Sequence, residues 1–378
     1  MEQVLSYLIW SPDPDFFTIP IADRPVRWYG LLFALGFIIS QQILMWIFRK
    51  DGKPEKAVET LTIYMVVATV IGARLGHCLF YAPEYYLSDP IKILYVWEGG
   101  LASHGGAIGI LIALWLFVRK HKEYRLFWVL DRMAIVVALT GALIRTGNFM
   151  NSEMEGVETH SSTGVVYARY TEDVIRDAFN YGGERVASVD FEKGGDIPST
   201  EPGHEPLTVK VTFARNVQIT DEEKRFVESR LRQALVSYTE VVQHIDFRSS
   251  EPLAYKFYEQ GGINYLEIYG LGIVRHPAQL YEAGYCILIF LLLLWLWKEK
   301  RSKLPEGFMF GLFMTLLWIL RFVDEFFKMN QEEFEEGMAL NMGQWLSIPM
   351  ALIGIGVMIW AMKKGYLETD QSKQVKGS

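Results

Sequence analysis

A glycine-rich stretch around one histidine is the first place where the sequence could do chemistry. Residues 99–109 read Gly-Gly-Leu-Ala-Ser-His-Gly-Gly-Ala-Ile-Gly, with His104 at the centre. Glycines let a lipid or a neighbouring helix approach the backbone closely, and imidazoles can move protons near neutral pH. His104 is therefore a candidate acid–base group. The simpler alternative is a packed helix start with a hydrogen-bonded histidine.

An arginine and two amides recur at short intervals in residues 145–156, which read Arg-Thr-Gly-Asn-Phe-Met-Asn-Ser-Glu-Met-Glu-Gly. Arg145, Asn148 and Asn151 are spaced by three, and Glu153 follows two residues later. At a helix end or in a tight turn, these side chains could converge on one polar pocket. Because a guanidinium holds phosphate oxygens with a planar fork of donors, the segment predicts a phosphate-binding site. The alternative is a buried Arg145–Glu153 ion pair that only fixes helix packing.

A third polar segment, residues 275–282, reads Arg-His-Pro-Ala-Gln-Leu-Tyr-Glu. Pro277 suits the first turn of a helix, so Gln279 and Glu282 would face inward one turn later. The segment indicates either a lining of polar side chains for a site or a hydrogen-bonded helix start.

A fourth cluster joins Arg321 to two acids, Asp324 and Glu325, at helical spacings of three and four. Alone, it is equally well explained by an internal salt bridge. Taken together, the four clusters favour a pocket for an anionic lipid headgroup, because ionisable groups within apolar segments are costly and usually mark function. The sequence lacks the motifs of zinc proteases, elbow-type serine hydrolases and P-loop pumps.

Long apolar segments must position these clusters. Hydrophobic residues make up 51% of the 378 residues and charged residues 21%, below the roughly 25% usual for a soluble domain. A helix needs about 20 apolar residues to cross a bilayer. We predict an all-α polytopic membrane protein with seven transmembrane helices, at about 28–48, 57–81, 101–118, 127–147, 277–297, 306–327 and 342–362.

The short loops sort by charge, which predicts the orientation of the chain. Basic residues follow the first, third, fifth and seventh segments: Arg49, Lys50, Lys53 and Lys56; Arg119, Lys120, Lys122 and Arg125; Lys298, Lys300, Arg301 and Lys303; Lys363 and Lys364. The positive-inside rule then places the N-terminus outside and the C-terminus in the cytoplasm. The net charge of −7 gives no support to nucleic-acid binding.

Residues 157–274 are charged and polar, and by the same rule lie outside the membrane. Leu207, Val209, Val211 and Phe213 alternate with other residues as in a half-buried strand. Thr220 and Glu223 have the spacing of a capping box that opens a helix, and 241–247 could be a second strand. We predict three parts: 1–156 with four helices, a small α+β extracytoplasmic insertion at 157–274, and 275–378 with three helices and a cytoplasmic tail.

Two cysteines, Cys78 and Cys286, both lie in apolar runs. They indicate buried small side chains rather than a disulfide framework or a metal site. We expect no metal and no cofactor.

Several motifs occur in register with those of one enzyme family. They are Trp28-Tyr29-Gly30, Glu98-Gly99-Gly100 with Ser103-His104-Gly105-Gly106, Arg145-x-Gly147-Asn148-Phe149-x-Asn151-x-Glu153-x-x-Gly156, Arg275-His276-Pro277-x-Gln279-Leu280-Tyr281-Glu282, Arg321 with Glu325-Phe326-Phe327, and Met342-Gly343-Gln344-x-Leu346-Ser347-Ile348-Pro349. Over residues 28–156 and 275–362 the chain resembles the bacterial prolipoprotein diacylglyceryl transferases. Ile144, Leu317 and the long 157–274 segment depart from the family pattern.

The resemblance implies an enzyme of the bacterial cytoplasmic (inner) membrane with its active site toward the outer, periplasmic leaflet. It would transfer the diacylglyceryl group of phosphatidylglycerol to the lipobox cysteine in a preprolipoprotein signal peptide, releasing glycerol 1-phosphate. Arg145 and Arg321 would hold the phosphate, and His104 would take or relay the thiol proton. The other implied site residues are Tyr29, Asn148, Asn151, Glu153, Gly156, Arg275, His276, Gln279, Glu282 and Glu325.

Two other classes stay open on the sequence. One is another phospholipid-using transferase, such as an acyltransferase, which would release a lysolipid. The other is a transporter whose arginines bind an anionic solute. A transporter favours repeated halves and helices broken near the bilayer midplane, whereas here the polar clusters lie at the outer ends of the segments and no repeat is visible.

Overall fold

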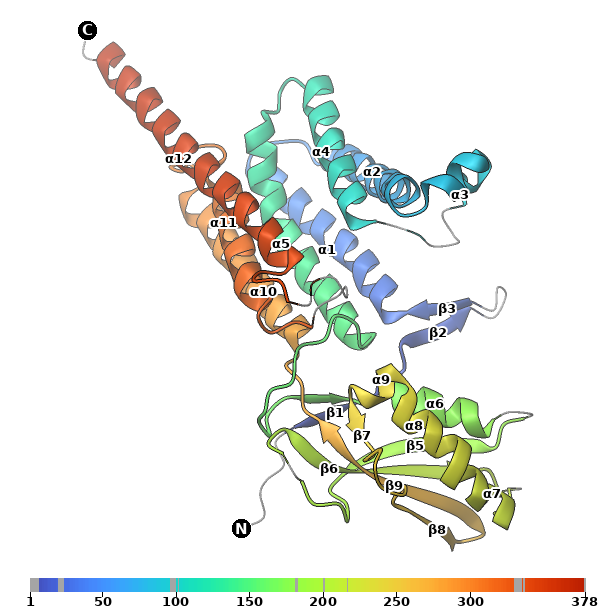
Figure 1. The fold of residues 1–378 in the computed structure, drawn as a ribbon. Coiled ribbons are helices and arrows are strands. Elements are labelled where there is room, and N and C mark those ends of the chain that lie inside the picture. The colour runs from blue at the N-terminus through green and yellow to red at the C-terminus, as the bar shows by residue number, and fades with distance from the viewer. Residues whose placement is uncertain are drawn as a thin grey trace. The chain divides into compact units, whose positions relative to one another are not determined.

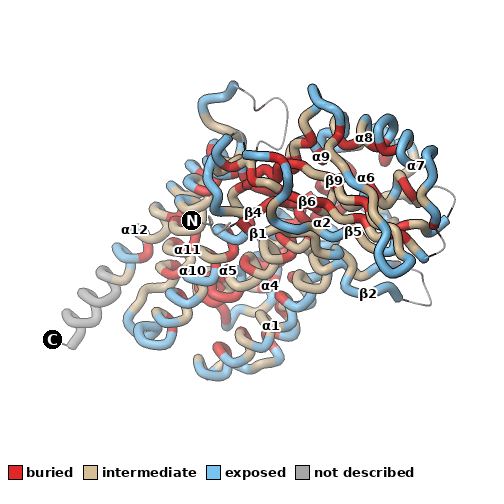
Figure 2. The backbone as a smooth tube through the Cα atoms, turned by 90° about the horizontal axis from the view of Figure 1, so that it is seen from below, coloured by how far each residue is buried: buried red, intermediate tan, exposed pale blue. Residues whose placement is uncertain are grey.

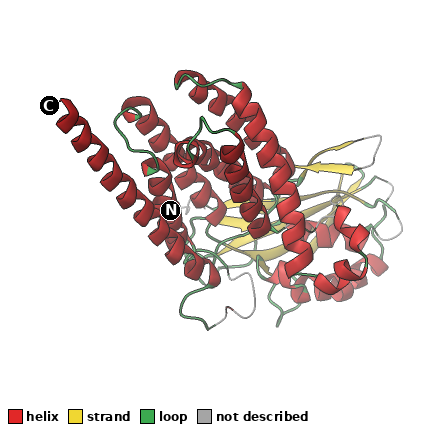
Figure 3. Ribbon diagram, turned by 90° about the horizontal axis from the view of Figure 1, so that it is seen from above, coloured by secondary structure: helices red, strands yellow, loops and turns green. Residues whose placement is uncertain are grey.

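The computed structural model describes residues 7–19, 24–95, 100, 102–180, 183–199, 201–215, 217–329, 335 and 337–376 (Figure 1). The chain forms two compact units, each built from separate stretches. Unit 1 comprises Met1–Leu32, Arg145–Ala283 and Val323–Met342; unit 2 comprises Phe33–Ile144, Gly284–Phe322 and Gly343–Ser378. Each strand from β1 to β9 belongs to unit 1, whereas unit 2 is built of helices. Figure 3 shows the helices in red and the strands in yellow.

Seven long helices follow the apolar segments of the sequence. They are α1 (Trp28–Lys50), α2 (Lys56–Phe80), α4 (Ser103–Lys120), α5 (Leu126–Met150), α10 (Ala278–Lys300), α11 (Phe308–Asp324) and α12 (Met342–Lys376). Within the described residues, five are long and apolar enough to cross a membrane: α1, α2, α5, α10 and Met342–Gly365 of α12. Helices α4 and α11 are shorter, with 18 and 17 residues, so seven spans remain a prediction.

Charged and polar contacts tie the helices of unit 2 together at one set of ends. The carboxylate of Asp51 forms ion pairs with Arg132, at 2.8 Å from Nη2 to Oδ2, and with Arg301, at 3.2 Å from Nη1 to Oδ1. Asp131, on α5, accepts the backbone amides of Gly307 and Phe310, each at 2.8 Å. The second pair of bonds satisfies amides at the start of α11 that have no partner within their own helix.

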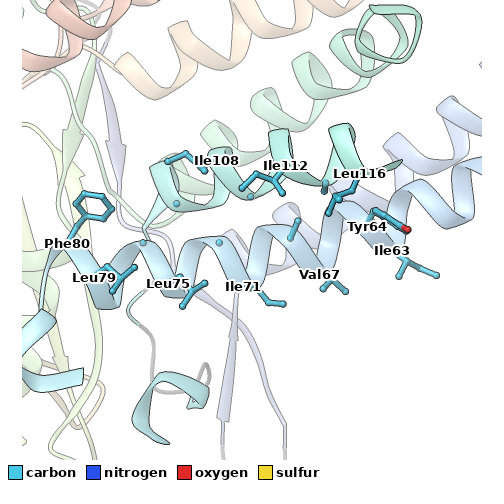
Figure 4. A pocket seen from close by; sticks show the side chains of 16 residues that line it. Ile63, Tyr64, Val67, Ile71, Leu75, Leu79, Phe80, Ile108, Ile112 and Leu116 are labelled. Atoms are coloured by element: carbon cyan, nitrogen blue, oxygen red, sulfur yellow. The ribbon is translucent and has the colours of Figure 1, made fainter. Parts of the chain in front are cut away.

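Helices α2 and α4 cross at glycines that leave no room for a side chain. A Cβ on Gly105 would lie 2.2 Å from the carbonyl oxygen of Gly72 and 2.7 Å from Cα of Gly76. Small residues are what lets membrane helices pack at such close range. Beside this crossing runs an apolar groove of about 630 Å³, lined among others by Ile71, Leu75 and Ile112 (Figure 4).

The connection after α2 contains two short helices, α3 (Pro83–Ser88) and η1 (Pro90–Leu94). Arg74, almost fully buried on α2, donates to the carbonyl oxygens of Lys92 at 2.7 Å and Ile93 at 2.9 Å. Its guanidinium also lies 4.9 Å from the ring of Tyr86. This one arginine therefore holds the connection against the C-terminal end of α2.

A five-stranded antiparallel sheet lies within residues 157–274, where the sequence predicts an α+β insertion. Its strands are β5 (Val186–Lys193), β6 (His204–Phe213), β7 (Ile245–Asp246), β8 (Tyr255–Gln260) and β9 (Ile263–Ile273), in the order β5-β6-β9-β7, with β8 also pairing β9. The predicted strand at 207–213 is part of β6, and Leu207, Val209, Val211 and Phe213 are buried as expected. Figure 2 colours the backbone by burial, with buried residues in red along β6.

Helices cover one face of this sheet. They are α6 (Arg169–Phe179), α7 (Asp221–Phe226), the π-helical turn η3 (Val227–Leu231), α8 (Arg232–Ser237) and α9 (Thr239–Val242). Ile175 and Leu231 pack with Val209 and Ile268 of the sheet in one buried apolar cluster. The apolar residues of these helices recur at helical spacing, so they form one stripe that packs against the sheet.

The predicted strand at 241–247 is wrong over its first half. Residues Thr239–Val242 form helix α9, and only Ile245–Asp246 join the sheet as β7. Val241 is fully buried from the helical turn. A short buried apolar run fits a helix or a strand equally well, so the sequence pattern did not distinguish them.

Two small sheets near the N-terminus complete unit 1. Strand β1 (Leu8–Trp10) pairs in parallel with β4 (Val165–Tyr167), and β2 (Asp15–Ile19) pairs with β3 (Arg24–Arg27). Trp10 stacks on Phe149 with ring centroids 4.3 Å apart and donates from Nε1 to its carbonyl oxygen at 2.9 Å. The N-terminal segment therefore packs against the end of α5.

The capping box that opens α7 gives a pH-dependent prediction. The carboxylate of Glu223 accepts hydrogen bonds from the backbone amide of Thr220 at 2.9 Å and from Nη2 of Arg185 at 2.7 Å. Burial alone would raise the pKa of Glu223, but these bonds outweigh it and lower the pKa from 4.5 to about 2. The stabilisation is therefore complete above about pH 4.5 and is lost as the pH falls towards 2.

We expect Glu223→Gln to lower the free energy of unfolding by about 1 kcal/mol at pH 7, with a smaller difference from wild type in acid. Thermal unfolding of the full chain in detergent at several pH values measures this. The neighbouring exposed Glu222→Gln is the matched control. Equal stability of the two variants at pH 7 would show that the capping box contributes nothing.

Candidate functional site

The site is built around the end of α5, where the chain leaves the helix in an unusual backbone. Ser152 and Met154 both have left-handed backbone angles, with φ of 53° and 58°. This region costs a residue with a side chain roughly 1 kcal/mol or more. Glu153 lies between them, and its amide donates to the carbonyl oxygen of Asn148 at 2.9 Å. The loop thus turns Glu153 back onto the helix end.

The predicted convergence of the 145–153 side chains is observed. Asn148 and Asn151 donate from Nδ2 to the two carboxylate oxygens of Glu153, each at 3.1 Å. Arg145 donates from Nη1 to Oδ1 of Asn148 at 3.2 Å. The side-chain amide of Asn148 therefore links Arg145 to the carboxylate of Glu153. The ion pair of Arg145 is formed with Glu282, at 2.9 Å from Nε to Oε2.

Lys328 is a member of the site that sequence reasoning missed. Its ammonium lies 2.8 Å from Glu282, 3.1 Å from Asp324 and 3.5 Å from Glu325, and its side chain is only 2% exposed. Asn341 adds a bond to Glu325 at 3.3 Å. In the sequence, the only sign of these contacts is that Glu325 and Asp324 precede Lys328 by three and four residues, the spacing of neighbours on a helix. Arg145, Glu282 and Lys328 thus form a continuous buried network.

The first turn of α10 braces the same loop. Gln279, 1% exposed, donates from Nε2 to the carbonyl oxygen of Glu153 at 2.7 Å and accepts from the hydroxyl of Tyr167 at 3.0 Å. Only glycine fits at position 156, because a Cβ there would lie 2.3 Å from the carbonyl oxygen of His276. Gln279 and Gly156 therefore fix the path of the loop.

Arg275 and His276 lie just before α10. The buried guanidinium of Arg275 donates to the carbonyl oxygen of Gln243 at 2.6 Å and to that of Gly156 at 3.2 Å, and burial lowers its pKa. His276 lies with Nδ1 3.0 Å from the hydroxyl of Tyr281, and burial also lowers the pKa of its imidazole. Arg275 thereby joins segments of unit 1 that are distant in sequence, and the backbone amide of His276 does the same by donating to the carbonyl oxygen of Val157 at 3.0 Å.

Tyr29, in the first turn of α1, packs on Gly147. A Cβ on that glycine would lie 3.0 Å from Cα of Tyr29. The tyrosine is thereby held beside the helix turn that carries Arg145 and Asn148. Unit 1 thus gathers most of the predicted site residues: Tyr29, Arg145, Asn148, Asn151, Glu153, Gly156, Arg275, His276, Gln279, Glu282 and Glu325.

His104 and Arg321 belong to unit 2. The imidazole of His104, exposed at the start of α4, lies 5.1 Å from the ring of Phe80 and 5.9 Å from that of Tyr81. The guanidinium of Arg321, near the end of α11, lies 5.8 Å from the ring of Trp318. Their placement relative to the Arg145 network stays a prediction. Glu98 and Gly99 lie outside the described residues.

Within the described residues, no group of three or more histidine, cysteine, aspartate and glutamate side chains could hold a metal ion. The network instead combines guanidinium, ammonium and amide donors with carboxylates. Such an arrangement suits binding of a phosphate and a polyol, because charge-assisted bonds hold the phosphate and amides and carboxylates can bond hydroxyl groups.

Comparison with known proteins gives one family. The model of the prolipoprotein diacylglyceryl transferases matches residues 14–360. A protein of Tolumonas auensis named phosphatidylglycerol–prolipoprotein diacylglyceryl transferase is 37% identical over 358 residues, covering 94% of this chain and 98% of its own. Proteins of the same name are 32% identical in Chloroherpeton thalassium and 34% identical in Porphyromonas gingivalis; they cover 96% and 95% of this chain, and 97% and 96% of their own length.

Proposed function

Since the chain belongs to the prolipoprotein diacylglyceryl transferase family, we propose that it transfers the diacylglyceryl group of phosphatidylglycerol to a prolipoprotein. The acceptor is the lipobox cysteine thiol in the signal peptide of the preprolipoprotein. A carbon–sulfur bond forms, the bond between the glyceryl carbon and the phosphate oxygen breaks, and glycerol 1-phosphate leaves. This is the first step of lipoprotein maturation.

The buried network around Arg145 is the observation that supports this function most. Displacement at a glyceryl carbon requires that the charge of the departing phosphate be stabilised. Arg145 is held through Nε by Glu282 and through Nη1 by Asn148, so its orientation is fixed before substrate binds. We assign its second terminal nitrogen, Nη2, to a phosphate oxygen, with Arg321 as a further phosphate ligand.

The thiol must also lose its proton, since its ordinary pKa of about 8.5 leaves little thiolate at neutral pH. We assign this step to His104, as base or proton relay. Tyr29, Asn148, Asn151 and Glu153 would orient the headgroup glycerol and Arg145. The remaining members, Gly156, Arg275, His276, Gln279, Glu282, Glu325 and the newly identified Lys328, would hold these groups in place.

The proposal includes a topology. Five candidate spans with α4 and α11 would give seven, with the N-terminus outside and the C-terminus in the cytoplasm. The enzyme would lie in the bacterial inner membrane with its site at the outer leaflet, and 157–274 would form an extracytoplasmic domain between the two membrane parts, 1–156 and 275–378. The loop charges support this orientation.

Product analysis separates this reaction from acyl transfer. Phosphatidylglycerol labelled in its headgroup would be given to the purified protein with a lipobox peptide. Diacylglyceryl transfer yields labelled glycerol phosphate and a peptide heavier by an intact diacylglyceryl group. A labelled lysolipid with a singly acylated peptide would overturn the proposal in favour of an acyltransferase.

Direct transfer predicts that the enzyme's own thiols are dispensable. Cys78 and Cys286 are buried, and the peptide supplies the nucleophile. We expect the Cys78→Ala, Cys286→Ala double variant to keep the transfer rate within about twofold, with a stability loss of about 1 kcal/mol from the vacated volume. Initial rates with labelled lipid measure this. A folded double variant without transfer would indicate a covalent enzyme intermediate instead.

A further inference from the structure

A buried histidine of the insertion contacts the loop that follows α5. His244 lies between α9 and β7, and its Nε2 contacts Oε2 of Glu155; the two side chains are 4% and 7% exposed. On the other side of the ring, Nδ1 contacts the carbonyl oxygen of Glu240. Because a carbonyl can only accept, Nδ1 carries a proton. The ring is therefore held from both sides, by the backbone of α9 and by the carboxylate of Glu155.

A second residue of the insertion supports the same loop. Tyr170, on α6, donates its hydroxyl to the carbonyl oxygen of Ser152 at 3.0 Å. Its ring also stacks on the imidazole of His244, with centroids 5.5 Å apart and planes 20° apart. Ser152 is one of the two residues with a left-handed backbone, so this bond falls where the loop is strained.

The contacts of the insertion surround Glu153. Ser152 precedes it, and Glu155 follows two residues later. The carbonyl oxygen of Glu155 accepts a hydrogen bond from the amide of Met329 at 3.2 Å, and the next amide, of Gly156, donates to the carbonyl oxygen of His276 at 3.0 Å. A strained backbone persists only where surrounding contacts over-determine it. His244 and Tyr170 supply such contacts, and the carboxylate of Glu153 is the group that bonds Asn148.

We propose that His244 is a positioning residue for the transfer reaction: through Glu155 it holds the 151–156 loop so that Glu153 and Asn148 orient Arg145. The inference rests on the proposed function. It gives the insertion a role in building the lipid headgroup site. It differs from a role in guiding the protein substrate, which would act on the peptide's KM.

The test uses full-length protein in vesicles containing phosphatidylglycerol, with a lipobox peptide as acceptor. We expect His244→Leu to lower kcat/KM for phosphatidylglycerol by at least about tenfold, because displacement of positioning groups by a fraction of an ångström has effects of this size. The peptide's KM should stay within about twofold. His244→Gln, which can still donate to Glu155, should recover most of the loss.

His204→Gln is the matched control. His204 forms another histidine–glutamate pair at the same junction, with Glu158 at 3.7 Å, but the two side chains are 17% and 36% exposed. We expect wild-type kinetics from it. Hydrogen exchange of the 151–157 amides should rise in His244→Leu and not in His204→Gln.

Tyr170→Phe covers the case in which His244→Leu does not fold. It keeps the ring on the imidazole and removes only the bond to Ser152, so a folded protein with a several-fold loss in the same kcat/KM supports the inference. Wild-type kinetics in folded His244→Leu or Tyr170→Phe, or a rise confined to the peptide's KM, would overturn the inference alone. A wild-type protein without transfer would overturn the proposed function as well.

Discussion

Replacing Lys328 by methionine is expected to lower the free energy of unfolding by about 3–5 kcal/mol, because it removes the buried cation that Glu282 and Asp324 share. Buried Asp324 would then lose the cation it pairs with, and Glu282 would keep only Arg145 as a partner. Thermal unfolding of the purified variant in detergent measures the loss. Transfer activity should fall with it, since Glu282 is also the ion-pair partner of Arg145.

A second substitution tests whether the loss of stability in Lys328→Met comes from the lost charge or from altered packing. In Lys328→Met combined with Asp324→Asn, one carboxylate fewer is left without its cation, so part of the stability should return. Lys224→Met is the matched control, because the ammonium of Lys224 pairs with Asp221 on an exposed surface and exposed pairs contribute little. A Lys328→Met variant as stable as this control would show that the buried network does not stabilise the fold.

Arg145→Lys is expected to reduce the rate of transfer by about 10²- to 10³-fold, the usual effect of removing one preorganised charge-stabilising group. Lysine keeps the positive charge but loses the planar fork that bonds Glu282 and Asn148 at once. The loss should therefore appear mainly in kcat. Initial rates over a range of phosphatidylglycerol concentrations measure it.

Arg176→Lys is the matched control for this arginine. Arg176 bonds Glu172 at 2.8 Å on the partly exposed face of α6, so its replacement should leave the rate unchanged. If Arg145→Lys retained the wild-type rate while folded, the fixed guanidinium would have no part in stabilising the departing phosphate.

The sequence predicted the elements whose signals are local. The seven helices follow the apolar segments because length and hydropathy are properties of each segment by itself. The strand at 207–213 followed from its alternation, and the capping box at Thr220 from its spacing. The convergence of Arg145, Asn148 and Glu153 was also predictable, because it occurs within one helix end and the next turn.

What the sequence could not predict are contacts between distant segments. The parallel pairing of β1 with β4 joins residues about 157 positions apart, and neither strand is long enough to show a periodicity. The contact of His244 with Glu155 joins residues 89 positions apart. The role of Lys328 is hidden for a different reason. Asp324 and Glu325 lie at helical spacing from both Arg321 and Lys328, and the tertiary packing decides which of the two basic residues they contact.

The pattern of residues 157–274 predicts a folded domain and assigns it no role. Its sheet and helices form their own apolar core, which accounts for the folding of the domain but not for its position in the chain. The contacts of His244 and Tyr170 with the 151–156 loop supply a reason for that position.

The most direct test of the central claim is a reconstituted reaction of the purified protein with phosphatidylglycerol and a lipobox peptide. Two controls accompany it, the Arg145→Ala protein and a peptide with serine in place of the lipobox cysteine. We predict a thioether-linked diacylglyceryl peptide and an equal amount of glycerol phosphate from the wild-type protein, and neither product in either control. Phosphatidylglycerol left intact by folded wild-type protein would contradict the assignment of this chain as a diacylglyceryl transferase.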